Sequence, residues 1–321
     1  MKSKYLVAAL ALTLVACSND ETDNQVVNEP TAARFYGEIS EAATRAAGTT
    51  WTADDAIGVT GKSGSTTYTN IKYEYVANGQ PFNVATSGNE IYYQSSAQVT
   101  FSAYYPFSGT EKTTPAPVTK TITAADQHAT DKSVEGKFTP QSQIDYLYGT
   151  GTGERGVNGG NVTFSFKHMM SKLVLVFIAG NEVNLDDLTQ YKLDDLEMNG
   201  SFDPTNGTAA ANTTPNTQTL TIERKTIPFT PENGKLVSSL ILYPQTASSA
   251  TLTVTVDGRE FTANLNIPAK TINSQDNGLV SGKKYTYNVT VGTQAVTVSQ
   301  ADIDDWTEGV SGGDGNVDAM P

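Results

Sequence analysis

Cysteine is nearly absent from this chain: a single thiol, Cys17, occurs in 321 residues. One cysteine cannot form an internal disulfide or supply a multi-cysteine zinc site. Histidine is almost as scarce, and His128 and His168 offer no usable set for a Ser-His-Asp triad or a zinc site. Beyond the N-terminal leader, no run approaches the roughly 18 apolar residues of a membrane-spanning helix. These absences argue against disulfide scaffolds, zinc enzymes and helical membrane proteins.

Charge is also limited, because charged residues make up 17% of the chain and the formal net charge is −13. A net negative protein is repelled by nucleic acid and by anionic membrane surfaces, so neither is expected as a partner. Threonine, glycine and asparagine are abundant, and there are 15 tyrosines. This composition favours strands joined by turns over long helices, and predicts an all-β fold.

The first 17 residues have the pattern of an export signal. Lys2 and Lys4 precede an apolar run over 5–15, too short to span a bilayer but of the length of a signal-peptide core. The run ends Leu-Val-Ala-Cys, which resembles the lipobox of bacterial lipoproteins, in which the cysteine is lipidated and becomes the new N-terminus. We therefore predict a lipoprotein signal peptide over 1–17 and lipidation at Cys17. An ordinary secretion signal with an incidental thiol is the alternative.

Residues 18–33 are polar and acidic, with too few bulky side chains to fold, and are expected to act as a tether. Acidic residues just after the lipidated cysteine also resemble surface-export signals of some Gram-negative lipoproteins. The next stretch, 33–39 (ARFYGEI), alternates Phe35, Gly37 and Ile39 with polar or exposed positions, which predicts a strand.

Strand patterns recur along the rest of the chain. Residues 162–168 alternate apolar and polar side chains, and two alternating runs, 252–256 and 261–267, flank Asp257-Gly258, a strong hairpin signal. Further strands are expected at 57–61, 71–79, 89–94, 99–107, 217–224, 238–244, 283–291 and 295–299. The spacing predicts two tandem antiparallel β-sandwich domains, at 46–180 and 181–308. One helical turn is expected near 184–191 with Asn184 as its cap, an exposed loop at 108–137, and a flexible tail at 309–321.

Several motifs suggest chemistry, and each also has a structural interpretation. The run GTGERG (151–156) matches a dinucleotide fingerprint, but a strand pattern follows it where a helix is needed, so a hairpin loop is expected. His168 shares the inward face of its strand with two phenylalanines and is predicted to be a core residue. The acidic run at 302–305 lacks the register of a calcium loop. No cofactor, metal site or enzymatic activity is predicted.

Three stretches together resemble the fimbrillin family, the subunits of type V pili. They are TRAAGTTWTADDAIGV (44–59), DYLYGTGTGERGVNGGNVTFSFKHMMSKLVLVF (145–177) and GKKYTYNVTVGTQAVTVSQADIDDW (282–306). The resemblance implies two transthyretin-like β-sandwiches, export as an outer-membrane lipoprotein exposed on the cell surface, and a place in a fimbrium.

The resemblance also implies maturation by a trypsin-like protease, removal of the N-terminal strand, and polymerisation by strand exchange with other fimbrial subunits. Arg45 follows the strand at 33–39, so cleavage between Arg45 and Ala46 would release the segment 18–45. Arg34 is the competing site, but cleavage there would leave the strand in place. An uncleaved Arg45 in an ordinary exposed loop is the structural alternative.

The C-terminal end departs from a donor-strand pattern, because Val310, Val317 and Met320 are its only apolar anchors among several glycines. Either residues 295–303 supply the exchanging strand, or the chain is a tip or accessory subunit. A surface glycan-binding lipoprotein is the second functional class, with Tyr92-Tyr93 or Tyr104-Tyr105 as a sugar platform. A host or bacterial surface ligand is a further candidate partner.

Overall fold

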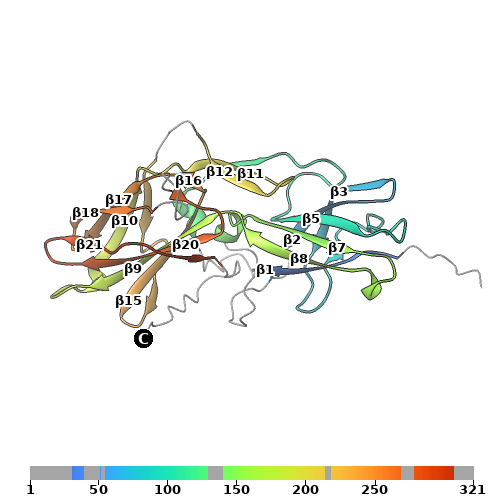
Figure 1. Cartoon of the computed structure of the whole chain (residues 1–321). Helices are drawn as coiled ribbons and strands as arrows, with labels where there is room; N and C mark the ends of the chain where they lie inside the picture. Colours follow the sequence, from blue (N-terminus) through green and yellow to red (C-terminus); the bar gives the residue numbers. More distant parts are fainter. Residues whose placement is uncertain are drawn as a thin grey trace, which may run out of the picture. The chain divides into compact units, whose positions relative to one another are not determined.

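The computed structural model describes residues 31–39, 51, 55–128, 140–213, 218–268 and 278–306. Within these residues the chain forms β-strands and short 3₁₀ helices (Figure 1). The helices are η1 (Ala124–Gln127), η2 (Pro140–Gln143), η3 (Asn158–Gly160) and η4 (Leu185–Asp187). The all-β prediction is confirmed. No helix in the described part is long and apolar enough to cross a membrane.

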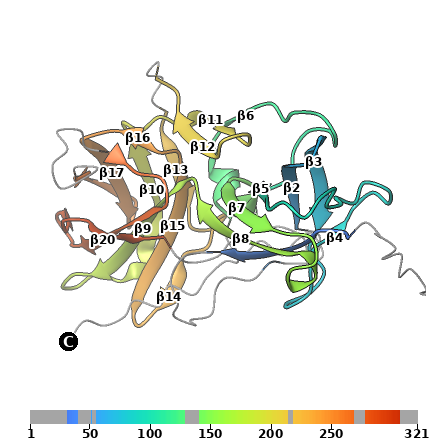
Figure 2. The ribbon, with the colours of Figure 1, turned by 45° about the vertical axis from the view of Figure 1, so that its right-hand side comes forward.

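The first sheet has seven strands in the order β1-β8-β7-β5-β2-β3-β4. Their bounds are β1 (Arg34–Ile39), β2 (Ala56–Ser63), β3 (Thr66–Glu74), β4 (Asn83–Val84), β5 (Val99–Tyr105), β7 (Leu147–Gly153) and β8 (Asn161–His168). Neighbouring strands are antiparallel except β1 and β8, which run parallel. The N-terminal strand therefore lies at one edge of this sheet, alongside β8 (Figure 2).

Two further sheets share a second hydrophobic core. One has the order β13-β10-β17-β18, and the other has β14-β15-β9-β20-β21, with β22 also paired to β20. Their bounds are β9 (Ser171–Ala179), β10 (Leu188–Asp194), β13 (Leu220–Glu223), β14 (Thr230–Glu232), β15 (Lys235–Leu242), β17 (Ser249–Val256), β18 (Arg259–Asn266), β20 (Lys283–Val291), β21 (Val296–Val298) and β22 (Asp302–Asp305). The Phe177 ring of β9 lies 5.5 Å from that of Tyr191 in β10. The Tyr191 hydroxyl is 2.8 Å from Ser238 Oγ of β15, so side chains from both sheets meet between them.

Two small sheets complete the fold. A three-stranded sheet has the order β12-β11-β6, with β6 at Val118–Thr121, β11 at Asn199–Asp203 and β12 at Thr208–Ala211. β16 (Gln245–Thr246) pairs with β19 (Gly278–Leu279). Phe202 of β11 stacks on Tyr146 at 4.7 Å and lies 6.3 Å from the ring of Tyr104 in β5. The small sheet thus packs against residues from the first half of the chain.

The buried hydrophobic residues fall into two clusters. One contains residues of 33–105 together with 147–166, and the other contains residues of 170–306 together with Tyr104, Ile122, Ile144 and Tyr146. Tyr104 and Tyr105 are neighbours on β5, yet they belong to different clusters, because successive strand residues point to opposite faces. Along the chain, Phe166 is the last residue of the first cluster, and Met170, a little later, belongs to the second. The boundary at residue 180 and the count of two tandem sandwiches stay predictions.

Many expected strands are present. β8 alternates exposed and buried residues over its whole length, and the hairpin of β17 and β18 turns at Asp257-Gly258, as predicted. Both turn residues have positive φ, 49° and 71°, as the favoured two-residue hairpin turn requires. The helical turn is η4, where the Asn184 side chain accepts a hydrogen bond from the backbone N–H of Asp186.

Some local predictions were wrong. Residues 89–94 form no strand; Tyr92 makes only an isolated bridge with Ala32. The segment 108–137 is not a plain exposed loop, because it contains β6 and η1, and Ile122 and Gln127 are buried. The Gln127 side chain bonds to the backbone of Ile241, which explains its burial. GTGERG lies only partly in a hairpin loop, since its first three residues end β7.

Candidate functional site: the N-terminal edge strand

β1 contributes to the core of the first sheet through alternate residues. Phe35 is fully buried and Ile39 is nearly so, whereas Arg34 and Glu38 are exposed. The strand pairs with β8 so that Phe35 lies beside Val162, Gly37 beside Phe164 and Ile39 beside Phe166. The predicted strand at 33–39 is therefore present, with the predicted residues facing inward.

The other edge of β1 is held by the segment 82–93. The backbone N–H of Phe82 donates to the carbonyl of Phe35 at 2.8 Å, and the N–H of Ala33 donates to the carbonyl of Ile91 at 2.8 Å. The N–H of Tyr93 donates to the carbonyl of Thr31 at 3.0 Å. Segment 82–93 therefore partly covers the sheet edge, which reduces the exposure of unpaired backbone groups.

The Phe35 ring occupies a pocket with aromatic walls. Its centroid lies 4.8 Å from that of Tyr73 and 5.2 Å from that of Phe101, both edge-to-face, and 5.4 Å from that of Phe164, nearly parallel. These are favourable geometries for aromatic pairs, each contributing ~0.5–1.5 kcal/mol beyond burial. Phe35 is thus the main anchor of β1.

Gly37 makes room for Trp51. A Cβ atom at Gly37 would lie 3.0 Å from ring atoms of Phe166 and Trp51 and 3.2 Å from Phe82. The indole N–H of Trp51 donates to the Gly37 carbonyl at 2.9 Å, and its ring packs edge-to-face on Phe82, Tyr105 and Phe166. Trp51, which follows Arg45 in the sequence, is thereby hydrogen-bonded to the backbone of β1, which precedes Arg45.

The predicted modification sites, Cys17, Arg45 and Ala46, lie outside the described residues. Arg45 comes six positions after Ile39 and six before Trp51, both of which are buried. Arg34, the competing cleavage site, is exposed at the first position of β1. Sequence reasoning identified β1 but missed Trp51 as its partner, because no local pattern indicates a hydrogen bond from an indole to a carbonyl fourteen residues earlier.

His168 is a core residue, as predicted. Its Nδ1 atom lies 2.8 Å from Oδ1 of Asp145, and both side chains are almost fully buried. Its ring stacks on Trp306 at 3.9 Å with an interplanar angle of 6°, which places the end of β8 against the last described residue. His168 is thus held by one hydrogen bond and one ring stack inside the core, and does not lie in an open cleft.

Replacing Asp145 by leucine is expected to lower the free energy of unfolding by ~1–3 kcal/mol, because the buried His168 Nδ1 would lose its hydrogen-bond partner. Denaturant titration of the intact chain measures this. Asp302→Asn, at an exposed position, is the control and should change stability by no more than ~0.5 kcal/mol. Equal stability of both variants would show that the contact contributes nothing.

The other motifs carry no reactive site among the described residues. Lys283 pairs with Asp305, and Lys284 lies 4.0 Å from Asp304, so part of the acidic run is neutralised by β20. The described residues contain no group of three or more His, Cys, Asp or Glu able to hold a metal ion.

The proposed aromatic platforms are largely buried. Tyr104 and Tyr105 are 2% and 0% exposed, and Tyr93 is 1% exposed with its hydroxyl bonded to the Gly160 carbonyl. Among these four tyrosines, only Tyr92 is partly exposed. Neither pair can therefore act as a flat sugar-binding surface.

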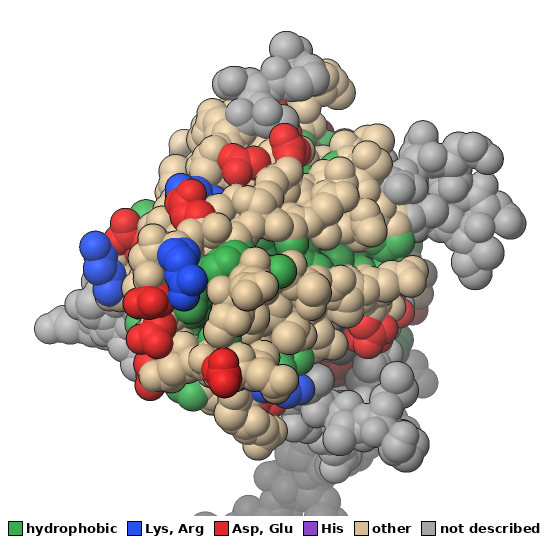
Figure 3. Space-filling model, turned by 90° about the vertical axis from the view of Figure 1, so that its left-hand side faces the viewer, with side chains coloured by type: hydrophobic (Ala, Val, Ile, Leu, Met, Phe, Trp, Pro, Cys, Tyr) green, Lys and Arg blue, Asp and Glu red, His purple; other side chains and the backbone are tan. Residues whose placement is uncertain are grey.

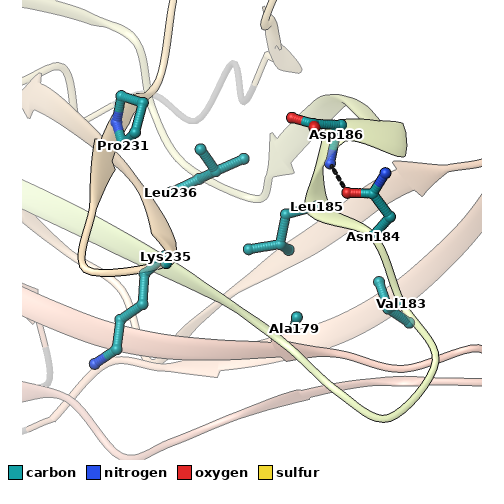
Figure 4. A pocket seen from close by; sticks show the side chains of 9 residues that line it. Ala179, Val183, Asn184, Leu185, Asp186, Pro231, Lys235 and Leu236 are labelled. Carbon is teal, nitrogen blue, oxygen red and sulfur yellow. Dashed lines mark hydrogen bonds between the residues drawn. The ribbon is translucent and has the colours of Figure 1, made fainter.

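A hollow of about 320 Å³ lies between η4 and the β14–β15 hairpin. Leu185 and Leu236 face each other across it, and Lys235 points away (Figure 4). The backbone N–H of Asp186 donates a hydrogen bond to the side-chain oxygen of Asn184. The face seen in Figure 3 shows a band of hydrophobic side chains in a furrow, with charged side chains near one end of it. The lining includes no histidine, cysteine, serine or threonine, so it offers no hydroxyl or thiol nucleophile beside an imidazole base.

Within its described residues, this is an all-β protein of several sheets, completed at one edge by an N-terminal strand. The chain belongs to the fimbrillin-like family, whose model matches residues 44–306. It is 28% identical over 334 aligned residues to a candidate fimbrium subunit, Fim1C, of Bacteroides uniformis, covering 99% of this chain and 100% of that protein. The family resemblance seen in the sequence is thus confirmed.

Solved structures show the same fold. A candidate cell adhesion protein from Bacteroides ovatus is 32% identical, with a TM-score of 0.70 over 86% of this chain and 98% of that one. A second candidate cell adhesion protein, from Bacteroides uniformis, is 24% identical with a TM-score of 0.62, covering 88% and 100% of the two chains.

Proposed function

We propose that this protein is a structural and adhesive fimbrial subunit, assembled by exchange of its N-terminal edge strand. The observation that carries the proposal is β1 itself: its apolar face fills the core of the first sheet, yet it lies at the edge and precedes a candidate cleavage site. The names of the relatives, a fimbrium subunit and cell adhesion proteins, support the same role. Its partners are then other fimbrial subunits, and its role is structural, with no catalysis required.

Removal of β1 would expose the aromatic walls around Phe35 and leave the N–H groups of Phe82 and Trp51 without their acceptors. An incoming strand would bury apolar side chains at ~1.5–3 kcal/mol each and restore backbone hydrogen bonds at ~0.5–1.5 kcal/mol each. This is β-strand addition, of which pilin donor-strand complementation is an established example. The gain would be large enough to hold two subunits together, once the association cost is met.

Maturation is proposed to occur between Arg45 and Ala46. Cleavage there would separate β1 from the rest of the chain, and the fimbrillin-like match begins at residue 44, just before this bond. Cleavage after Arg34 would leave nearly all of β1 in place. Before maturation, lipidation at Cys17 is proposed to hold the protein at the outer membrane, exposed on the cell surface, from which it enters the fimbrium.

The two candidate positions in the filament are that of a stalk subunit and that of a tip or accessory subunit. The glycine-rich C-terminal end favours the second, because it offers few apolar anchors for a groove. A surface glycan-binding lipoprotein is the weaker alternative, since the tyrosine pairs that suggested it are largely buried.

Arg45→Ala is expected to abolish the Ala46 N-terminus and the SDS-resistant oligomers that a trypsin-like protease produces from the wild-type chain. Arg34→Ala is the matched control and should retain both. N-terminal sequencing and gel electrophoresis without boiling provide the measurements, and sequencing of protein from cells reports lipidated Cys17 or Ala46. A wild-type product that stays monomeric, or an Arg45→Ala variant that still assembles, contradicts the proposal.

A further inference from the structure

We propose that the groove occupied by β1 selects an incoming strand of the pattern aromatic-x-Gly-x-aliphatic, and that this strand comes from a different polypeptide, not from a second copy of this chain. The inference rests on the proposed strand exchange and specifies its partner. It follows from two observations. The inward positions of β1 are Phe35, Gly37 and Ile39, and the pattern that they form occurs nowhere else in the sequence.

The first position requires an aromatic ring. Phe35 is fully buried among Tyr73, Phe101 and Phe164, whose rings surround it on three sides. An aliphatic or polar side chain would leave part of this volume empty and lose the ring contacts. Cavities of this kind reduce stability roughly in proportion to their volume.

The second position favours glycine. At Gly37 a Cβ atom would already lie 3.0 Å from two aromatic rings and 3.2 Å from a third, so even a methyl group would push these rings back, and a larger side chain would displace them further. One of these rings is Trp51, whose indole N–H must also reach the carbonyl of the same residue. A β-branched residue here would press against that hydrogen bond and against Phe166.

The last position and the backbone add three further conditions. Ile39 is 5% exposed and lies beside Phe166 of β8, which favours an aliphatic side chain four residues after the aromatic one. The residue two positions before the aromatic one cannot be proline, because the N–H of Ala33 donates to the carbonyl of Ile91. The strand must also run parallel to β8.

This pattern occurs once in the 321 residues, at Phe35–Gly37–Ile39. Residues 295–303 (AVTVSQADI) have no aromatic residue and no glycine, and residues 307–321 have no aromatic residue. A second copy could offer the pattern only from its own β1. Donating that strand would leave the second copy's own groove empty, and in a matured copy the strand has already been removed. A strand from a different subunit is therefore the occupant that satisfies the groove.

The test uses the chain cleaved at Arg45 and separated from its N-terminal segment, titrated into a trace amount of fluorescein-labelled peptide, with binding followed by anisotropy. A peptide of residues 31–41 should bind. Its Phe35→Ala form should bind at least ~100-fold more weakly, and its Gly37→Val form ~10–100-fold more weakly. The Glu38→Gln peptide, changed at an exposed position, is the control and should stay within about threefold. Peptides of residues 295–306 and 307–321 should bind at least ~100-fold more weakly than the native peptide.

A second measurement uses the intact chain, in case the cleaved chain is difficult to handle. Grafting residues 295–303 in place of 33–41 or of 34–42 should raise the unfolding equilibrium constant at least ~100-fold in both registers. Equal binding of the native peptide and the C-terminal peptides, or a graft as stable as the wild type, overturns this inference but leaves strand exchange intact. Failure of every peptide to bind a folded, cleaved chain overturns the proposed function as well.

Discussion

Replacing Phe35 by alanine is expected to lower the free energy of unfolding of the intact chain by ~3–5 kcal/mol. The side chain is fully buried, and its loss leaves a cavity walled by Tyr73, Phe101 and Phe164. Those rings belong to β3, β5 and β8, which the rest of the sheet holds in place, so they cannot move inward far enough to fill the space. The lost contacts and the remaining cavity both contribute.

Denaturant unfolding of the uncleaved chain measures this effect. Arg34→Ala, one residue earlier and exposed, is the control and should change stability by no more than ~0.5 kcal/mol. A Phe35→Ala chain as stable as the Arg34→Ala chain would mean that β1 contributes nothing to the folded protein. The groove required for strand exchange would then not exist.

Local periodicity was sufficient to predict individual strands. The alternation in 161–168 and the Asp257-Gly258 turn act over a few residues, so both appear in the structure as expected. Strand order could not be predicted in the same way. β1 pairs with β8 more than 120 residues later, and the choice depends on which apolar faces meet, a long-range condition that one short pattern does not encode.

The wrong predictions have a related cause. Ile91 and Tyr93 are apolar and alternate, but they cover the edge of β1 as a loop and do not extend a ladder of their own. Residues 108–137 are poor in apolar side chains, yet Gln127 is buried because its amide satisfies the backbone of Ile241 from a distant strand. At the candidate site the sequence indicated Phe35 and Gly37, but not the Trp51 indole that crowds the Cβ position of Gly37.

Raising the pH above about 10 is expected to unfold the protein in one steep transition. Burial raises the pKa of nine described tyrosines above the ordinary value; for Tyr93 it reaches about 12, and the charge of Asp55 adds to the effect of burial at Tyr105. The others are Tyr73, Tyr104, Tyr146, Tyr191, Tyr243, Tyr285 and Tyr287.

The direction follows from proton linkage. In the unfolded chain a tyrosine loses its proton near pH ~10, whereas in the folded protein these tyrosines keep theirs to higher pH. The stabilisation is fully present below the unfolded pKa and is lost as the pH rises toward and through the folded values. Each such tyrosine lowers the free energy of unfolding by up to ~1.4 kcal/mol per pH unit. Since domains are stable by ~5–15 kcal/mol, several together suffice to unfold the protein within one or two pH units.

Circular dichroism and tyrosinate absorbance, followed together during an alkaline titration, check this expectation. The two signals should change in the same narrow range, because the buried hydroxyls ionise only when the chain opens. Tyr191→Phe removes one of these groups from the core between β10 and β15, and should make the fall of unfolding free energy with pH shallower by up to ~1.4 kcal/mol per pH unit. Gradual ionisation of all tyrosines near pH ~10, with the sheet signal unchanged, would show that the aromatic core does not resist alkaline opening.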